Sequence, residues 1–317
     1  MHEPWVHALR ARIDVRPKDH SVFALIDMAG LSHLAQASDI LSQIRKAGAV
    51  SVLQDERPDA LLATPWLLPL QERSSVRTRL LARTCEWAMR GPAVTWLVSP
   101  LSPEALAQRL RIRTEAELPG NHPILLRHFD PRVLPELVQA LHPLQRKAFL
   151  AMGNEWLYLD RSHTLQVIAL TPADAADAFE SPWLMDDRQF AALLAASEVD
   201  QLMPELARAA PIEFMRLPVT QRVDLARQGL RLTAAWHLSS LADQTTVGML
   251  LLKLGEGFHL QPNWVPWVNA MTQQRMSLLQ AIERATESLA TSTSRSDIGA
   301  RCLLIQERTT TNKKQET

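Results

Sequence analysis

This 317-residue sequence has few cysteines, no net charge and no long apolar run, and each of these features excludes certain classes of protein. The two cysteines, Cys85 and Cys302, lie far apart, a spacing that indicates neither a disulfide framework nor a thiolate metal site. Lysine plus arginine and aspartate plus glutamate both number 34, so the chain lacks the net positive charge that carries most nucleic-acid binding. We therefore expect a reducing compartment and no nucleic-acid partner.

The apolar runs are too short for a membrane segment. The longest, VGMLLLKL at 247–254, is far shorter than the roughly 20 residues that a spanning helix needs. The opening MHEPWVHALRARID has no apolar core of the signal-peptide type. These absences predict a soluble, cytoplasmic protein without a membrane partner.

The first half of the chain alternates short apolar runs with amphipathic stretches. The run at 63–70 contains prolines, which favours an edge strand or a loop over a central strand. The alternation predicts an α/β domain over residues 1–172, with a mixed sheet flanked by helices. The other runs predict strands at 21–28, 49–53, 93–100 and 123–129 and a closing antiparallel pair at 155–160 and 165–170.

The second half changes character. Residues 173–187 lie in an acidic, Ala- and Pro-rich stretch and predict a linker. Residues 291–317 are rich in Ser, Thr and Lys and predict a disordered tail, whose apolar island CLLI (302–305) is either a docking element or a loosely packed turn. Between them, residues 188–290 predict an all-α lobe, with helical patterns at 188–208, 221–241, 246–254 and 265–290.

The stretch ILLRHFDPRVL (124–134) concentrates polar side chains after an apolar run. In a catalytic interpretation of this stretch, His128 acts as a general base, and Arg127 and Arg132 bind an oxyanion or a phosphate. Together with Asp27, at the end of an earlier strand, His128 and Arg132 then make a hydrolase-like enzyme. In a structural interpretation, Asp130 caps the following helix, and Arg127 pairs with Asp130 or with another carboxylate.

The structural interpretation is favoured because the remaining parts of an active site are missing from the sequence. It contains no nucleophile elbow, no phosphate-binding glycine-rich loop and no H-E-x-x-H motif. The histidines lack the spacing of metal ligands. We therefore expect no catalytic residue, no metal and no cofactor, and we expect Asp27 to cap the next helix or to pair with an arginine.

Arginines are concentrated between residues 70 and 113, where eight stand against three glutamates. Arg73 and Arg77, and likewise Arg79 and Arg83, are four residues apart, so each pair projects from one side of a helix. Three interpretations stay open: a solvated face, a surface for an acidic protein partner, and contact with the acidic 170–200 stretch of the same chain.

Tryptophan is abundant, with nine residues. Trp264 and Trp267 lie in the proline-containing segment GFHLQPNWVPWV. They either pack as a corner of the core, which is favoured, or serve as aromatic anchors for a partner, because tryptophan is enriched at interface hot spots.

Several segments, taken in order, are similar to one family. They are FALIDMAG (23–30), TPWLLPL (64–70), TWLVSPLSPEALAQRLR (95–111), PGNHPILLRHFDPRVL (119–134) and Trp156. Over about residues 20–160 the chain resembles the type VI secretion adaptor chaperones, also called Tap or TEC proteins and long catalogued as a domain of unknown function. At His128 this family tends to carry an aromatic residue instead. The resemblance implies a structural signature of Asp27, Trp66, Trp96, Arg127, Asp130 and Arg132.

The resemblance also implies a function. Members of this family are non-catalytic adaptors that hold a toxic effector and help to load it onto the secretion spike, a VgrG trimer with or without a PAAR cap. The expected partners are therefore a cognate effector and VgrG or PAAR, and the family supplies no catalytic residues. Two alternatives stay open: the hydrolase-like enzyme, and an immunity protein that neutralises a toxin.

Overall fold

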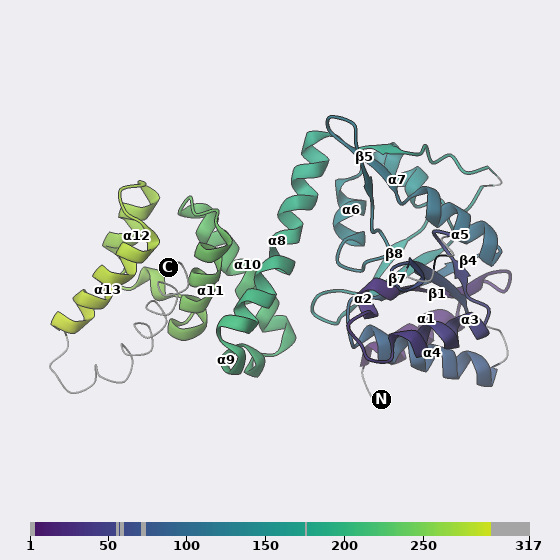
Figure 1. The fold of residues 1–317 in the computed structure, drawn as a ribbon, viewed down its shortest axis with the longest axis horizontal. Coiled ribbons are helices and arrows are strands. Elements are labelled where there is room, and N and C mark those ends of the chain that lie inside the picture. The colour runs from purple at the N-terminus through teal and green to yellow at the C-terminus, as the bar shows by residue number, and fades with distance from the viewer. Residues whose placement is uncertain (1–3, 55–56, 58–59, 71–73, 175, 293–317) are drawn as a thin grey trace. The chain divides into compact units, whose positions relative to one another are not determined.

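The computed structural model describes residues 4–54, 57, 60–70, 74–174 and 176–292 (Figure 1). The chain forms two compact units, residues 1–197 and 198–317. The boundary between them lies inside helix α8 (Asp187–Ala209), beyond the 173–187 segment that the sequence predicts as a linker. The predicted disordered tail lies outside the described residues, except for 291–292 at the end of the last helix.

A six-stranded sheet forms the centre of the first unit, and all of its neighbouring strands are antiparallel. Its long central strands, β1 and β4, are almost completely buried, as their continuous apolar sequences require. The order of the strands is β2-β3-β1-β4-β7-β8, with β1 (Ser21–Asp27), β2 (Val50–Ser51), β3 (Pro65–Pro69), β4 (Val94–Ser99), β7 (Glu155–Leu159) and β8 (Leu165–Ala169).

The prediction of an edge strand or loop at 63–70 was wrong. Strand β3 is buried between β2 and β1. Its prolines, Pro65 and Pro69, are its first and last residues, so the N–H groups between them remain available to the ladder with β1.

A second sheet has three short strands in the order β6-β5-β9, namely β5 (Glu115–Leu118), β6 (His122–Leu125) and β9 (Trp183–Leu184). The pair β5–β9 is parallel, whereas β5–β6 is antiparallel. The strand predicted at 123–129 was therefore only partly right, because β6 ends at Leu125 and residues 126–133 form a loop with turns and a bend from 128 onward.

Helices cover both faces of the large sheet (Figure 1). One face carries α1 (Pro4–Asp14), α2 (Met28–Leu31), α3 (Ala37–Lys46) and α4 (Ser74–Ala88), and the other carries α5 (Pro103–Ile112), α6 (Leu134–Ala140) and α7 (Pro143–Phe149). The residues of β1 alternate between these two layers: Val22, Ala24 and Ile26 pack on the first, whereas Phe23 and Leu25 pack on the second.

The segment predicted as a linker is bound to the first unit by Arg113. The Arg113 side chain has no exposed surface, and it forms a bidentate pair with Asp177 at 2.6 and 2.8 Å. Its remaining N–H groups donate to the carbonyls of Phe149, Arg109 and Ala148 at 2.8 Å, so all five guanidinium donors are used. Although burial raises the pKa of Asp177, the hydrogen bonds and charge of Arg113 outweigh it and leave that pKa below its ordinary value.

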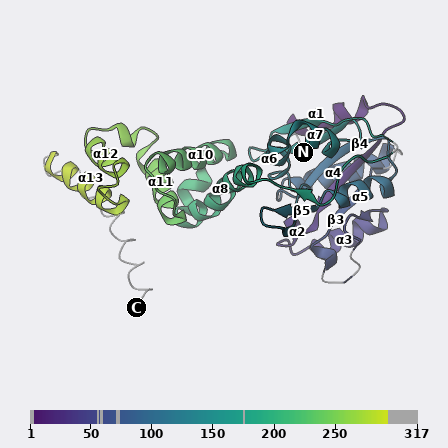
Figure 2. The ribbon, with the colours of Figure 1, turned by 90° about the horizontal axis from the view of Figure 1, so that it is seen from above.

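The second unit is entirely helical where it is described (Figures 1 and 2). Both views show α10 and α11 side by side, and α12 packs against α13. Gly248 allows α11 to approach α8, because a Cβ there would lie 2.6 Å from Leu206 Cδ2. Its elements are the end of α8, α9 (Pro211–Arg216), α10 (Val219–Ala235), α11 (Leu241–Leu254), η2 (Phe258–Leu260), α12 (Val265–Thr272) and α13 (Leu278–Ser292). The predicted fold class, an α/β lobe followed by an all-α lobe, is confirmed.

Replacement of Arg113 by methionine is expected to lower the free energy of unfolding by about 3–5 kcal/mol, because it leaves Asp177 without its counter-charge. Urea unfolding measures the loss. Arg111→Met, on the same helix, removes only bonds to Gln108 and is expected to cost no more than about 0.5 kcal/mol. Equal losses in the two variants would contradict this account of the segment.

Candidate functional site

The charged stretch after β6 reaches the end of β1 through an ion pair. The Arg127 guanidinium pairs with the Asp27 carboxylate, one hundred residues earlier in the chain. Asp27 has no exposed surface and also accepts a hydrogen bond from Ala29 N at 3.0 Å, which caps α2. Asp27 thus fulfils both of its predicted alternatives, a cap and a partner for an arginine.

Asp130 does not cap the next helix, contrary to the expectation from the Asp-Pro pair. Helix α6 begins four residues later, at Leu134. The Asp130 side chain instead closes a local turn, accepting from Arg132 N at 2.9 Å, from Arg132 Nε at 3.1 Å and from Arg132 Nη2 at 2.7 Å. The chain therefore turns once more before the helix starts, and Arg132 has the acidic partner that its position near a helix start favours.

His128 is a core residue. Its ring makes edge contacts with Phe129, Phe149 and Trp156 at centroid distances of 5.6–5.8 Å, and Nε2 lies 2.9 Å from the Leu110 carbonyl. Burial lowers the pKa of His128 to about 4, so the imidazole is neutral at pH 7. Its other nitrogen, Nδ1, is buried and has no hydrogen-bond partner in the described structure. An aromatic residue suits this position, because the imidazole leaves a polar atom unpaired.

The three residues of the enzyme hypothesis have separate partners. His128 is enclosed by aromatic rings, Arg132 is bound to Asp130, and Asp27 is bound to Arg127. Burial raises the pKa of Asp27 more than the Arg127 charge lowers it, although the carboxylate also accepts a helix-cap hydrogen bond. The charges of this cluster therefore join β1 to the 126–133 turn.

The two signature tryptophans, Trp66 and Trp96, form hydrogen bonds between the large sheet and residues outside it. Trp96 on β4 is fully buried and donates to Thr84 Oγ1 of α4 at 3.0 Å. Trp66 on β3 donates to the Leu61 carbonyl at 3.2 Å. Each buried indole thus satisfies its N–H group while filling the core.

The arginines between residues 70 and 113 include a buried pair and a more exposed group on α4. Arg109 and Arg113 are buried and contact the acidic 170–200 stretch, which was one of the open interpretations. The arginines of α4 lie on the surface or partly exposed: Arg77 pairs with Asp14 of α1 at 3.1 Å, and Arg83 pairs with Glu86 at 3.0 Å.

Arg79 is the remaining described arginine of α4. It is exposed and forms no ion pair with the described residues. Arg73, the other candidate, lies outside the described residues. The exposed basic surface of α4 therefore rests on Arg79 and Arg83, which are one helical turn apart.

Trp264 and Trp267 belong to the core of the second unit. Trp264 is 3% exposed and makes an edge contact with Phe258 at 4.9 Å. Trp267 is partly buried against the same cluster, and its indole nitrogen is fully covered. Both tryptophans therefore pack in the core, as the favoured interpretation predicts, and Trp264 exposes too little surface to anchor a partner.

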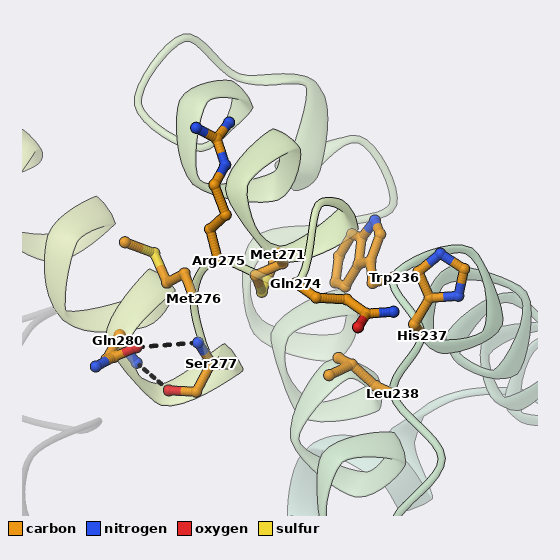
Figure 3. A pocket seen from close by; sticks show the side chains of 9 residues that line it. All are labelled: Trp236, His237, Leu238, Met271, Gln274, Arg275, Met276, Ser277 and Gln280. Atoms are coloured by element: carbon orange, nitrogen blue, oxygen red, sulfur yellow. Dashed lines mark hydrogen bonds between the residues drawn. The ribbon is translucent and has the colours of Figure 1, made fainter.

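A hollow of about 500 Å³ opens in the second unit between the end of α10 and the α12–α13 connection (Figure 3). In Figure 3, Ser277 and Gln280 bond to each other on one side, and Arg275 points away from them. The nine lining residues include one imidazole, His237, but no carboxylate or thiol. The sequence offered no signal for this hollow, because its walls come from segments more than thirty residues apart that carry no motif.

The described part of the chain contains no group of three or more His, Cys, Asp or Glu side chains able to hold a metal ion. Cys85 is a buried free thiol whose pKa burial raises to about 12, so it is protonated at neutral pH. None of the described helices has both the length and the apolar character needed to cross a membrane.

Comparison with known proteins gives one match. Residues 22–148 match the family model described as a domain of unknown function, DUF4123. The match covers less than half of the chain, from β1 to α7, and includes all of the signature residues from Asp27 to Arg132. No curated protein and no solved structure matches the chain.

The Asp27–Arg127 pair predicts a strong energetic coupling between these two residues. Arg127→Met is expected to lower the free energy of unfolding by about 3 kcal/mol at pH 7, because it leaves a buried carboxylate unpaired. Adding Asp27→Asn, which keeps the helix cap, is expected to restore most of that loss. Urea unfolding of the two single variants and the double variant measures the coupling, and simple additivity would contradict the pairing.

The buried His128 predicts a pH dependence of stability. The unfolded chain takes up this proton near pH 6.5, whereas the folded chain takes it up only near pH 4. Stability is therefore fully present above pH 6.5 and falls as the pH is lowered, by about 2 kcal/mol at pH 5. His128→Phe removes this contribution while other groups titrate as before. The unfolding free energies of both proteins at pH 7 and pH 5 test it, and an equal acid loss would disprove it.

Proposed function

We propose that this chain is a non-catalytic adaptor chaperone of a type VI secretion system, which binds an effector and helps to load it onto a VgrG or PAAR spike protein. The observation that carries the proposal is the DUF4123 match over residues 22–148, in the region whose motifs resemble the adaptor chaperones. In this role the chain works in the cytoplasm before the effector is secreted.

The charged cluster supports a role without catalysis. Asp27 and Asp130, the two carboxylic acids of this cluster, have almost no exposed surface, and each is bound to an arginine. His128, the only base of the cluster, is enclosed in the core. Such groups stabilise a scaffold, whereas an acid or base needs access to a substrate.

The chemistry of α4 supports an acidic region on the effector as the binding partner. Arg79 and Arg83 project from one side of the helix, and the ion pair of Arg83 with Glu86 is exposed and therefore weak. An acidic partner surface can replace Glu86 without a large desolvation cost. Apolar contacts would supply most of the affinity, and these charges would select the partner and speed association.

Charge reversal on α4 tests the partner surface. For an adaptor, a toxin gene and a spike gene are expected beside the gene for this chain, and the toxin is expected to co-purify with it. Arg79→Glu combined with Arg83→Glu is expected to slow association with that toxin about tenfold and to weaken its salt dependence. Surface plasmon resonance at two salt concentrations measures both effects.

Arg208→Glu is the matched control, because Arg208 is exposed on α8 and pairs three residues away with Glu205, as Arg83 does with Glu86. It is expected to leave binding unchanged. Unaltered association in the α4 variant would remove Arg79 and Arg83 from the interface, and the absence of any complex would refute the adaptor role. Toxin activity is measured in parallel, since neutralisation by this chain would identify an immunity protein instead.

A further inference from the structure

The outer edges of the two sheets differ in how well they are protected from pairing with another chain. An unpaired strand edge attracts other strands, and proteins usually shorten it or interrupt it with proline or charge. Strands β2 and β9 have only two residues each, and β6 contains Pro123. The remaining edge, β8, has five residues, LQVIA, with neither a proline nor a charged residue.

The free backbone groups of β8 follow from its pairing with β7. Leu170 N donates to Asn154 O at 2.9 Å, and Asp160 N donates to Thr164 O at 3.0 Å. Since hydrogen-bonded pairs alternate along an antiparallel ladder, the even-numbered residues of β8 bond to β7. The N–H and C=O groups of Leu165, Val167 and Ala169 therefore point away from the sheet, and no hydrogen bond of theirs is found in the described structure.

The sequence of β8 is complementary to itself in the antiparallel direction. A two-fold axis beside Val167 places Val167 opposite its own copy and Leu165 opposite Ala169, so that a large side chain meets a small one. Each of these pairs can exchange two N–H···O bonds across the seam. No like charges face each other, because β8 has no charged residue.

Helix α1 extends this surface with small side chains. Arg12 pairs with Glu155, the β7 residue opposite Ala169, whereas Asp14 pairs with Arg77 of α4, so the Arg12 side of α1 faces the β8 edge. Ala8 and Val15, four residues before and three residues after Arg12, are exposed on the same side; Val15, which directly follows the last residue of α1, is 82% exposed. Small residues allow two such helices to approach each other closely across a two-fold axis.

We infer that the β8 edge and the side of α1 that carries Ala8 and Val15 form the interface of a homodimer, in which two copies of this chain pair β8 with β8 in antiparallel orientation. The six-stranded sheets of the two copies then continue into each other. The strand seam alone is short, and the α1 contacts enlarge the buried area toward the size that a specific dimer needs. This inference does not rest on the proposed adaptor function.

The full-length chain tests the dimer directly. Sedimentation velocity over a concentration series is expected to show a mass that rises from 35.6 kDa to twice that value. Ala8→Glu places like charges at the inferred interface, changes only an exposed position, and is expected to keep the mass of one chain. Ala169→Pro, which removes an outward N–H group, is expected to do the same. The control is Ala192→Glu, the same substitution at an exposed position of α8, which is expected to dimerise normally.

Hydrogen exchange locates the interface. In the dimer, the amides of Leu165, Val167 and Ala169 are expected to exchange at least about tenfold more slowly than in the Ala8→Glu monomer. A wild-type chain that keeps a single-chain mass at every concentration overturns the inference. So does a dimer in which these amides exchange as fast as in the monomer, or protection that appears only when a different protein is added.

Discussion

A charge removed from water must meet an opposite charge, and the first unit depends on this constraint at two places. Asp27 is completely buried at the end of β1, and Arg127 reaches it from one hundred residues further along the chain. Arg113 is completely buried at the C-terminal end of α5, and Asp177 reaches it from the acidic segment. Each pair would be costly to break, because one charge would stay buried alone. The turn at 126–133 and the segment at 173–187 are thereby bound to the sheet.

These pairs also separate the structural charges from those available to a partner. The carboxylates of Asp27 and Asp130 are buried, and the arginines that bind them are satisfied inside the same chain. On α4, by contrast, the basic side chains of Arg79 and Arg83 face solvent; within the described part of the chain Arg79 forms no ion pair, and that of Arg83 is weak. The proposed adaptor role would need a rigid scaffold and a surface that can exchange partners, and the two groups of arginines could provide one each.

The proposed surfaces lie on helices of the same layer. Helix α1 carries small residues on the side toward β8 and is tied to α4 by the Arg77–Asp14 pair on the other side. Dimerisation through β8 would therefore leave α4 accessible and present its basic surface twice. Two linked copies bind a multivalent partner more tightly than one, without any new contact.

Local sequence patterns determined much of the fold. Continuous apolar runs predicted β1 and β4, and helical periodicity predicted the all-α lobe, because both signals depend only on neighbouring residues. The same local evidence failed at β3, whose terminal prolines suggested an edge, and at Asp130, whose proline neighbour suggested a helix cap. In both cases the outcome depended on backbone partners that the local sequence does not reveal.

What the sequence alone determined about this protein is the character of its segments: two lobes, a neutral overall charge and a motif region, residues 22–148, that matches the DUF4123 family model. Only the tertiary structure decided which arginine meets which carboxylate, that His128 is enclosed by aromatic rings, and that β8 is an unprotected edge. The physical reason is that these properties belong to pairs of distant residues, and burial and pairing are set only when the chain brings the two together.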